Sequence, residues 1–232
     1  MTRKRQGSDR DDVARTRRRR IVIIALSALL LVGGLLLALG MGRQQPAPPR
    51  AEDRGGPTAP ATPPSPSGGA SKPHPRHVTA LPASEPIRVT IPSLKVSSTL
   101  EQLGRDKNRA METPRDPDRA GWYRPGPAPG SEGPAVIAGH VTWDSAPAVF
   151  FRLAGLGPGA RIEVARQDGR TAEFTVDRVA RYAKDRFPTV EVYRNLDHAG
   201  LRLITCGGSY SKADNRYADN VVVYATLTGS HT

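Results

Sequence analysis

Short runs of apolar residues that alternate with polar ones dominate the chain from Ile87 onward. Residues 87–91, 161–166 and 170–182 follow the period of two that is typical of half-buried β-strands. Asp168-Gly169 lies between the last two segments and is a strong signal for a hairpin turn. About seven or eight such strands can be counted, with no long helical pattern. We therefore expect an all-β domain with short helices, closed into a β-barrel.

Two apolar runs near the C-terminus frame the chain's most reactive side chain. Residues 201–205 alternate and lead directly into Cys206, and Gly207-Gly208 is expected to end that strand. Arg216 follows ten residues later and precedes a strongly β-prone run, residues 221–227. This order predicts that Cys206 and Arg216 cap two neighbouring strands at the same end of a sheet.

An upstream run has the same form and ends at a histidine. Residues 134–139 are apolar or small and lead into His140, as a buried strand delivering a side chain at its end would. Residues 187–193 form a proline-containing apolar segment that is expected to make a short helix.

The N-terminal region has a different character. Residues 21–42 contain no charge, and these 22 residues span about 33 Å as a helix, against about 30 Å for a bilayer core. Residues 1–20 carry nine Lys/Arg against three Asp, which predicts a cytoplasmic tail. We expect a retained membrane anchor with everything after Arg43 outside. The alternative is a cleaved signal peptide, whose apolar core is usually only about 7–15 residues.

Residues 43–85 are rich in proline mixed with Ala, Ser, Thr and Gly, a composition that cannot bury enough apolar surface to fold. They predict a disordered, semi-rigid linker, in which His74 and His77 are expected to be solvated rather than to bind a metal. Residues 86–229 remain as the folded domain, for which we predict no metal site and no cofactor.

The basic composition does not indicate a nucleic-acid partner. The chain has a formal net charge of +12, and residues 1–20 supply half of it. The folded domain shows no basic face with residues suited to reading bases, so nucleic-acid binding is excluded from the leading functions.

Cys206 is the only cysteine, so its thiol forms no internal disulfide. It is either a small buried apolar group or a free reactive thiol. The adjacent glycines and Arg216 favour a nucleophile, because positive neighbours stabilise a thiolate. His140 lies 66 residues upstream at a matching strand end, which indicates Cys–His nucleophilic chemistry.

These motifs resemble those of sortases. The resemblance covers about residues 86–229 and rests on four motifs in chain order: Ala138-Gly139-His140, Leu203-Ile204-Thr205-Cys206, Arg216, and Asp219-Asn220-Val221-Val222-Val223-Tyr224-Ala225. Further matches are Ile91-Pro92, Gly121-Trp122-Tyr123 and Pro188-Thr189. The Cys-Gly-Gly sequence and the Asp-Asn-Val-Val-Val-Tyr-Ala run are most similar to class F sortases of actinobacteria.

The resemblance implies an eight-stranded β-barrel and a membrane-bound cysteine transpeptidase. Its partners would be secreted proteins with a C-terminal LPxTG-like signal, and a peptidoglycan precursor amine. By this resemblance, Cys206 attacks the Thr carbonyl and the chain is cleaved between Thr and Gly. His140 protonates the departing amine and deprotonates the incoming one, and Arg216 donates hydrogen bonds to the substrate or the oxyanion.

Two alternatives stay open. One is a non-catalytic wall-associated binding domain in which Cys206 is merely buried. The other is a different Cys-dependent cell-wall hydrolase or transpeptidase. An L,D-transpeptidase would show a Ser-x-Gly-Cys-type motif where this chain has Thr205-Cys206, and a papain-like hydrolase would place its cysteine before its histidine.

Overall fold

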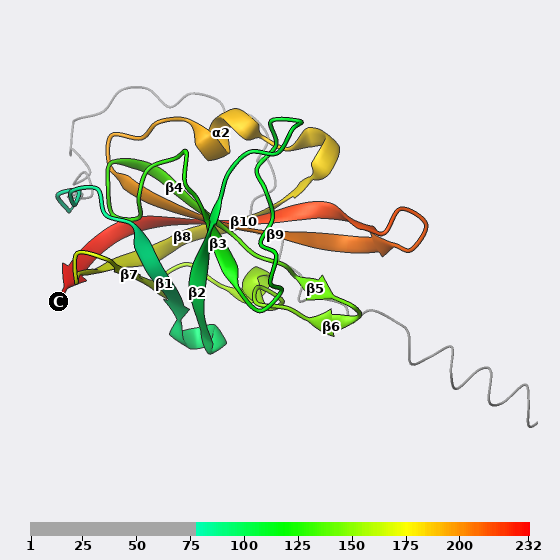
Figure 1. Ribbon diagram of the computed structural model, residues 1–232, viewed down its shortest axis with the longest axis horizontal. Helices are drawn as coiled ribbons and strands as arrows, with labels where there is room; N and C mark the ends of the chain where they lie inside the picture. The colour runs from blue at the N-terminus through cyan, green and yellow to red at the C-terminus, as the bar shows by residue number, and fades with distance from the viewer. Residues whose placement is uncertain (1–77) are drawn as a thin grey trace, which may run out of the picture. The chain divides into compact units, whose positions relative to one another are not determined.

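The computed structural model describes residues 78–232 (Figure 1). The predicted cytoplasmic tail, the membrane anchor and most of the linker lie outside these residues. Within the described part of the chain, the helices are too short and too polar to cross a bilayer.

Eight strands close into a barrel in the order β1-β2-β3-β4-β9-β10-β8-β7. They are β1 (Pro86–Ile91), β2 (Val96–Leu103), β3 (Ala120–Tyr123), β4 (Gly133–Ala138), β7 (Arg161–Arg166), β8 (Thr171–Ala183), β9 (Ala199–Ser211) and β10 (Arg216–His231). The short strands β5 (Thr142–Trp143) and β6 (Ala146–Pro147) form a separate hairpin. The remaining elements are η1 (Pro92–Leu94), η2 (Leu153–Gly155), η3 (Lys184–Arg186) and α2 (Thr189–Tyr193). The predicted all-β fold and closed eight-stranded barrel are confirmed.

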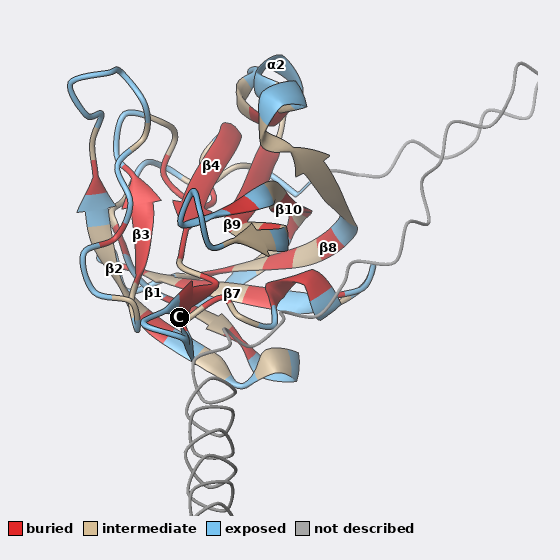
Figure 2. Ribbon diagram, turned by 90° about the vertical axis from the view of Figure 1, so that its right-hand side faces the viewer, coloured by how far each residue is buried: buried red, intermediate tan, exposed pale blue. Residues whose placement is uncertain are grey.

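Strand alternation produces two apolar clusters on opposite faces of the same strands. The barrel interior holds side chains such as Ile137, Leu203 and Val223. Their chain neighbours Val136, Ile204 and Val222 face outward and pack with Val192 of α2. Figure 2 shows α2 over this part of the barrel, with its outer surface exposed. Part of the outer face of β4, β9 and β10 is therefore covered by the connection from β8 to β9.

Strand β9 is longer than the sequence predicted. It continues through Cys206 and Gly207-Gly208 to Ser211, and the β9–β10 hairpin projects beyond the barrel in Figure 1. The two glycines do not end the strand. The ladder shifts register between Tyr217 and Asp219, and Gly208 has a φ of 76°, so the chain bulges there and keeps pairing. Cys206 consequently lies inside a strand rather than at its end.

Residues 78–85, which the composition assigned to the linker, pack against the barrel; we call them the N-terminal segment. The Leu81 amide donates to the Gly130 carbonyl at 2.8 Å. The fully buried guanidinium of Arg166 donates to the carbonyl oxygens of Pro82 (2.5 Å) and Pro129 (2.8 Å). The folded domain thus begins before residue 86, because a buried arginine uses the backbone of this segment as its acceptor.

Candidate active site

Parallel pairing of β4 with β9 brings His140 and Cys206 together. Ala138 pairs with Ile204, the Gly139 amide donates to the Ile204 carbonyl at 3.1 Å, and the Thr205 hydroxyl donates to the Gly139 carbonyl at 2.8 Å. His140 and Cys206 both come two residues after the paired Ala138 and Ile204, on strands about 4.8 Å apart. The expectation that two similar apolar strands deliver these side chains to neighbouring positions agrees with this pairing.

Both side chains line one groove, with a cavity volume of about 830 Å³. Its floor is the outer face of β4 and β9, including Val136, Ala138 and Ile204. One wall is the loop between β2 and β3, residues 104–119, and the other is the β8–β9 connection, which contributes Phe187, Thr189 and Tyr193. The floor along β4 is about 20 Å long at about 3.3 Å per residue. This length suits about six residues of extended peptide.

His140 is held by contacts on two sides. Its Nε2 lies 2.8 Å from the carbonyl oxygen of Pro114, which can only accept, so Nε2 carries a proton. In the neutral imidazole Nδ1 is then the nitrogen left to exchange a proton. The ring meets Trp143 edge-on, with ring centroids 5.0 Å apart. Thr142, beside that tryptophan, hydrogen-bonds the Tyr217 hydroxyl of β10 at 2.9 Å, which fixes the β5–β6 hairpin.

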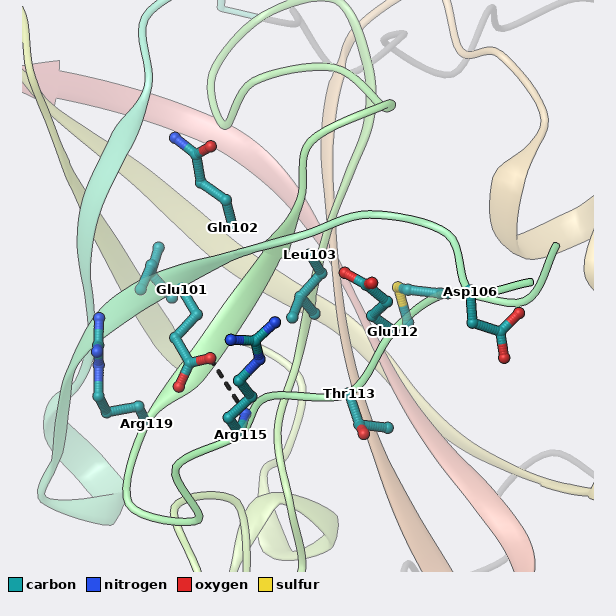
Figure 3. A pocket seen from close by; sticks show the side chains of 10 residues that line it. Glu101, Gln102, Leu103, Asp106, Glu112, Thr113, Arg115 and Arg119 are labelled. Carbon is teal, nitrogen blue, oxygen red and sulfur yellow. Dashed lines mark hydrogen bonds between the residues drawn. The ribbon is translucent and has the colours of Figure 1, made fainter. Parts of the chain in front are cut away.

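The loop that carries Pro114 is fixed by carboxylates, as Figure 3 shows for Glu101 and Arg115. Glu101 accepts from the amides of Arg115 and Asp116, both at 3.1 Å. Glu112 accepts from the Gly104 amide at 2.8 Å. These side chains line a second cavity of about 690 Å³ that contains neither Cys206 nor His140. Their oxygens serve the loop backbone, and among the described residues no group of three or more His, Cys, Asp or Glu is arranged to hold a metal.

The cation beside the thiol is Lys184. Its Nζ donates to the half-buried Sγ of Cys206 at 3.4 Å. Lys184 begins η3, directly after β8, so it reaches the thiol from the chain that closes one wall of the groove. The sequence does not predict this residue, because a lysine in a connection 22 residues upstream of Cys206 carries no local signal for its position.

Arg216 is not brought to Cys206, contrary to the expectation. Cys206 pairs with Asn220, whereas Arg216 pairs with Ser211 near the turn of the hairpin. Four residues of β10 correspond to about 14 Å at about 3.4 Å per residue. The Arg216 side chain is exposed and does not line the groove. The error arises from the bulged hairpin, which extends past Cys206 where the glycines suggested that the strand stops.

A cluster of side chains around Tyr224 holds α2, part of one wall of the groove, against the barrel. The guanidiniums of Arg178 and Arg202 lie 3.5 Å and 4.6 Å from the Tyr224 ring centroid. Arg178 also pairs with Glu191 of α2, and the Tyr182 and Tyr224 hydroxyls are 3.1 Å apart. Burial raises the pKa of Tyr224 far above its ordinary value, so its hydroxyl stays neutral. The cluster links the outer face of the barrel to α2.

A protein-family model, the sortase domain, matches residues 89–228. Solved structures similar to this chain include sortase A from Listeria monocytogenes, at 20% identity and a TM-score of 0.48, covering 65% of this chain and 90% of that one. Sortase A from Corynebacterium diphtheriae has 20% identity and a TM-score of 0.48, covering 63% of this chain and 62% of that one. Streptococcus agalactiae sortase C1 has 19% identity and a TM-score of 0.47, covering 62% of this chain and 69% of that one. No curated protein matches the sequence.

Proposed function

The chain belongs to the sortase family, and we propose that it is a membrane-anchored cysteine transpeptidase that acts on cell-wall sorting signals. One observation carries the proposal: Cys206 and His140 line the same open groove, each two residues beyond the last paired residues of β4 and β9, Ala138 and Ile204. The apolar floor of that groove suits an extended peptide. An extended peptide in the groove would place its scissile bond next to the thiol.

The reaction begins at the sulfur of Cys206. Its thiolate adds to the carbonyl carbon of the Thr in an LPxTG-like signal, and the carbonyl π electrons move to oxygen. The resulting tetrahedral intermediate collapses to a thioester as the bond to the Gly nitrogen breaks. The sorting signal is thereby cut between Thr and Gly, and the protein stays on the enzyme as an acyl group.

His140 moves the proton in both halves of the reaction. The departing amine is a poor leaving group, so it must take a proton from the imidazolium of His140 as the C–N bond breaks. The incoming amine of a peptidoglycan precursor then gives a proton to the neutral imidazole and attacks the thioester. The hydrogen bond from Nε2 to Pro114 fixes the ring and leaves Nδ1 for this exchange. Water in place of the amine would give hydrolysis.

The N-terminal sequence supports a location at the outer surface of the cell membrane. Residues 21–42 are uncharged and follow a basic tail, and the proline-rich residues 43–77 separate them from the domain. We expect a tag placed after Thr232 to be digested by protease added to intact protoplasts. Protection of that tag would contradict the proposed orientation.

The choice of sorting signal is testable with a peptide panel. The purified full-length chain in detergent is incubated with labelled LPxTG-like peptides and amine acceptors, and the products are read by mass spectrometry. We expect cleavage between Thr and Gly and an acyl–amine product, both absent in Cys206→Ala. A panel in which no peptide is cut would favour a non-catalytic wall-binding domain, and a cut at another bond would favour a different Cys-dependent wall enzyme.

A further inference from the structure

Lys184 is placed beside the reacting sulfur by the strands themselves. Tyr182 of β8 pairs with Asn220 of β10, which pairs with Cys206 of β9, so the three residues form one row across the sheet. Lys184 follows Tyr182 by two residues, as the first residue of η3, directly after the end of β8. Its Nζ lies 3.4 Å from the Cys206 sulfur, on the side from which it can meet an oxygen that develops charge next to that sulfur.

We propose that Lys184 is the catalytic cation of this site: it favours the thiolate of Cys206 and then donates a hydrogen bond to the oxyanion. The inference rests on the proposed transpeptidase function for its second half only. A positive neighbour stabilises a thiolate whether or not a peptide is present. A fixed donor aimed at developing charge lowers the barrier of the step that creates it.

Other cations near the site are less well placed for this role. Arg216 pairs four residues away along β10, at an exposed position of the hairpin. Arg181 lies 3.5 Å from the carboxylate of Asp219. Arg105 lines the groove, but its side chain donates to the Tyr123 hydroxyl at 2.6 Å. Tyr123 lies on β3 one residue beyond the Trp122–Ile137 pair, on the side away from His140.

Every proton in the reaction is accounted for if Lys184 stays protonated throughout. The Cys206 proton passes to His140, and the ammonium of Lys184 faces the thiolate that results. On addition to the carbonyl the negative charge moves from sulfur to oxygen, and the ammonium follows it by a hydrogen bond without giving up its proton. Collapse of the intermediate re-forms the C=O bond and breaks the C–N bond, and the leaving nitrogen takes its proton from His140. Lys184 then faces a neutral thioester.

The first test needs no substrate. Because the chain has one cysteine, the rate of alkylation by iodoacetamide, a neutral reagent, reports on Cys206 alone. The rate is measured at pH 7 on the full-length chain in detergent, for wild type, Lys184→Met and Lys184→Arg. Lys212→Ala is the matched control, since Lys212 is exposed in the β9–β10 turn. We expect Lys184→Met to be alkylated about tenfold more slowly, equivalent to about 1.4 kcal/mol, with Lys184→Arg and the control close to wild type.

The second test uses a cleavable sorting peptide and separates binding from turnover. We expect kcat in Lys184→Met to fall about 10²–10³-fold, the usual loss on removing one oxyanion donor. KM for the peptide should change little, and Lys184→Arg should recover part of kcat. Near-UV circular dichroism identical to wild type establishes that Lys184→Met is folded; Lys184→Gln replaces it if it is not.

The outcomes distinguish this inference from the proposed function. Wild-type alkylation and turnover rates in Lys184→Met overturn the role of Lys184 and leave the transpeptidase intact. A loss of both rates in Arg216→Ala, with none in Lys184→Met, would assign the cation to Arg216 instead. If wild type cuts no peptide while Lys184→Met is still alkylated slowly, the proposed function fails and the Lys184–Cys206 pair stands.

Discussion

Gly139→Ala tests how tightly the end of β4 is held beside Cys206. A Cβ added at Gly139 would lie 2.6 Å from the Phe150 ring and 2.8 Å from Val149, whereas ordinary contacts begin at 3.4 Å. Phe150 is 1% exposed, and its amide donates to the His140 carbonyl at 2.9 Å. It cannot move away freely, so the strand end that carries His140 must shift by about 0.8 Å to relieve the overlap.

Two quantities should change together in this variant. Overpacking of this size destabilises a protein by about 1–3 kcal/mol, which lowers Tm by several degrees in a domain of this size. A displacement of about 1 Å in a catalytic group costs about 10²-fold in rate. We expect differential scanning calorimetry and the peptide-cleavage assay to show both losses.

Gly157→Ala is the matched control, because nothing lies within 4 Å of the added Cβ. We expect its stability to stay within about 0.5 kcal/mol of wild type and its activity to be unchanged. Wild-type Tm and turnover in Gly139→Ala would refute the close packing described for the end of β4.

Two further predictions concern the buried arginine that docks the N-terminal segment. Arg166→Met removes the donor to two carbonyl oxygens and should cost about 3 kcal/mol of unfolding free energy, whereas the exposed Arg170→Met should cost little; equal Tm values would contradict the anchoring role. The hydrogen bond from Arg166 lowers the pKa of Asp168. The stability that the Arg166–Asp168 pair contributes is therefore present above the ordinary Asp pKa and is lost as the pH falls through the lowered pKa. In acid denaturation followed by circular dichroism, Asp168→Asn should lack that part of the pH dependence, and a curve parallel to wild type would count against the pair.

The sequence was sufficient to predict the barrel and the neighbouring positions of Cys206 and His140 in one groove. Residues 134–140 and 201–206 share one pattern, an apolar run leading to a reactive side chain. Because β4 pairs in parallel with β9, the two side chains that end these patterns lie near each other. The turn at Asp168-Gly169 between β7 and β8 was also predicted from the Asp-Gly signal. Gly169 has a φ of 79°, which glycine adopts without strain.

Features that depend on tertiary contacts were not predicted. Gly207-Gly208 suggested a strand end but forms a bulge in a continuing ladder, which leaves Arg216 about 14 Å along β10 from the partner of Cys206. Lys184 meets the thiol only because the β8–β9 connection returns along the same face. The N-terminal segment has the composition of a linker but supplies acceptors for Arg166, a contact between distant parts of the chain. The similarity to class F remains a prediction.

The most direct test of the central claim is a search for an acyl-enzyme on Cys206. The full-length chain is mixed with a cleavable sorting peptide, quenched in acid and analysed by mass spectrometry. The thioester mechanism predicts an adduct whose mass equals the peptide fragment ending in Thr, located on Cys206 and released by hydroxylamine. Cleavage that persists in Cys206→Ala, or cleavage by wild type with no hydroxylamine-sensitive adduct, would contradict the account.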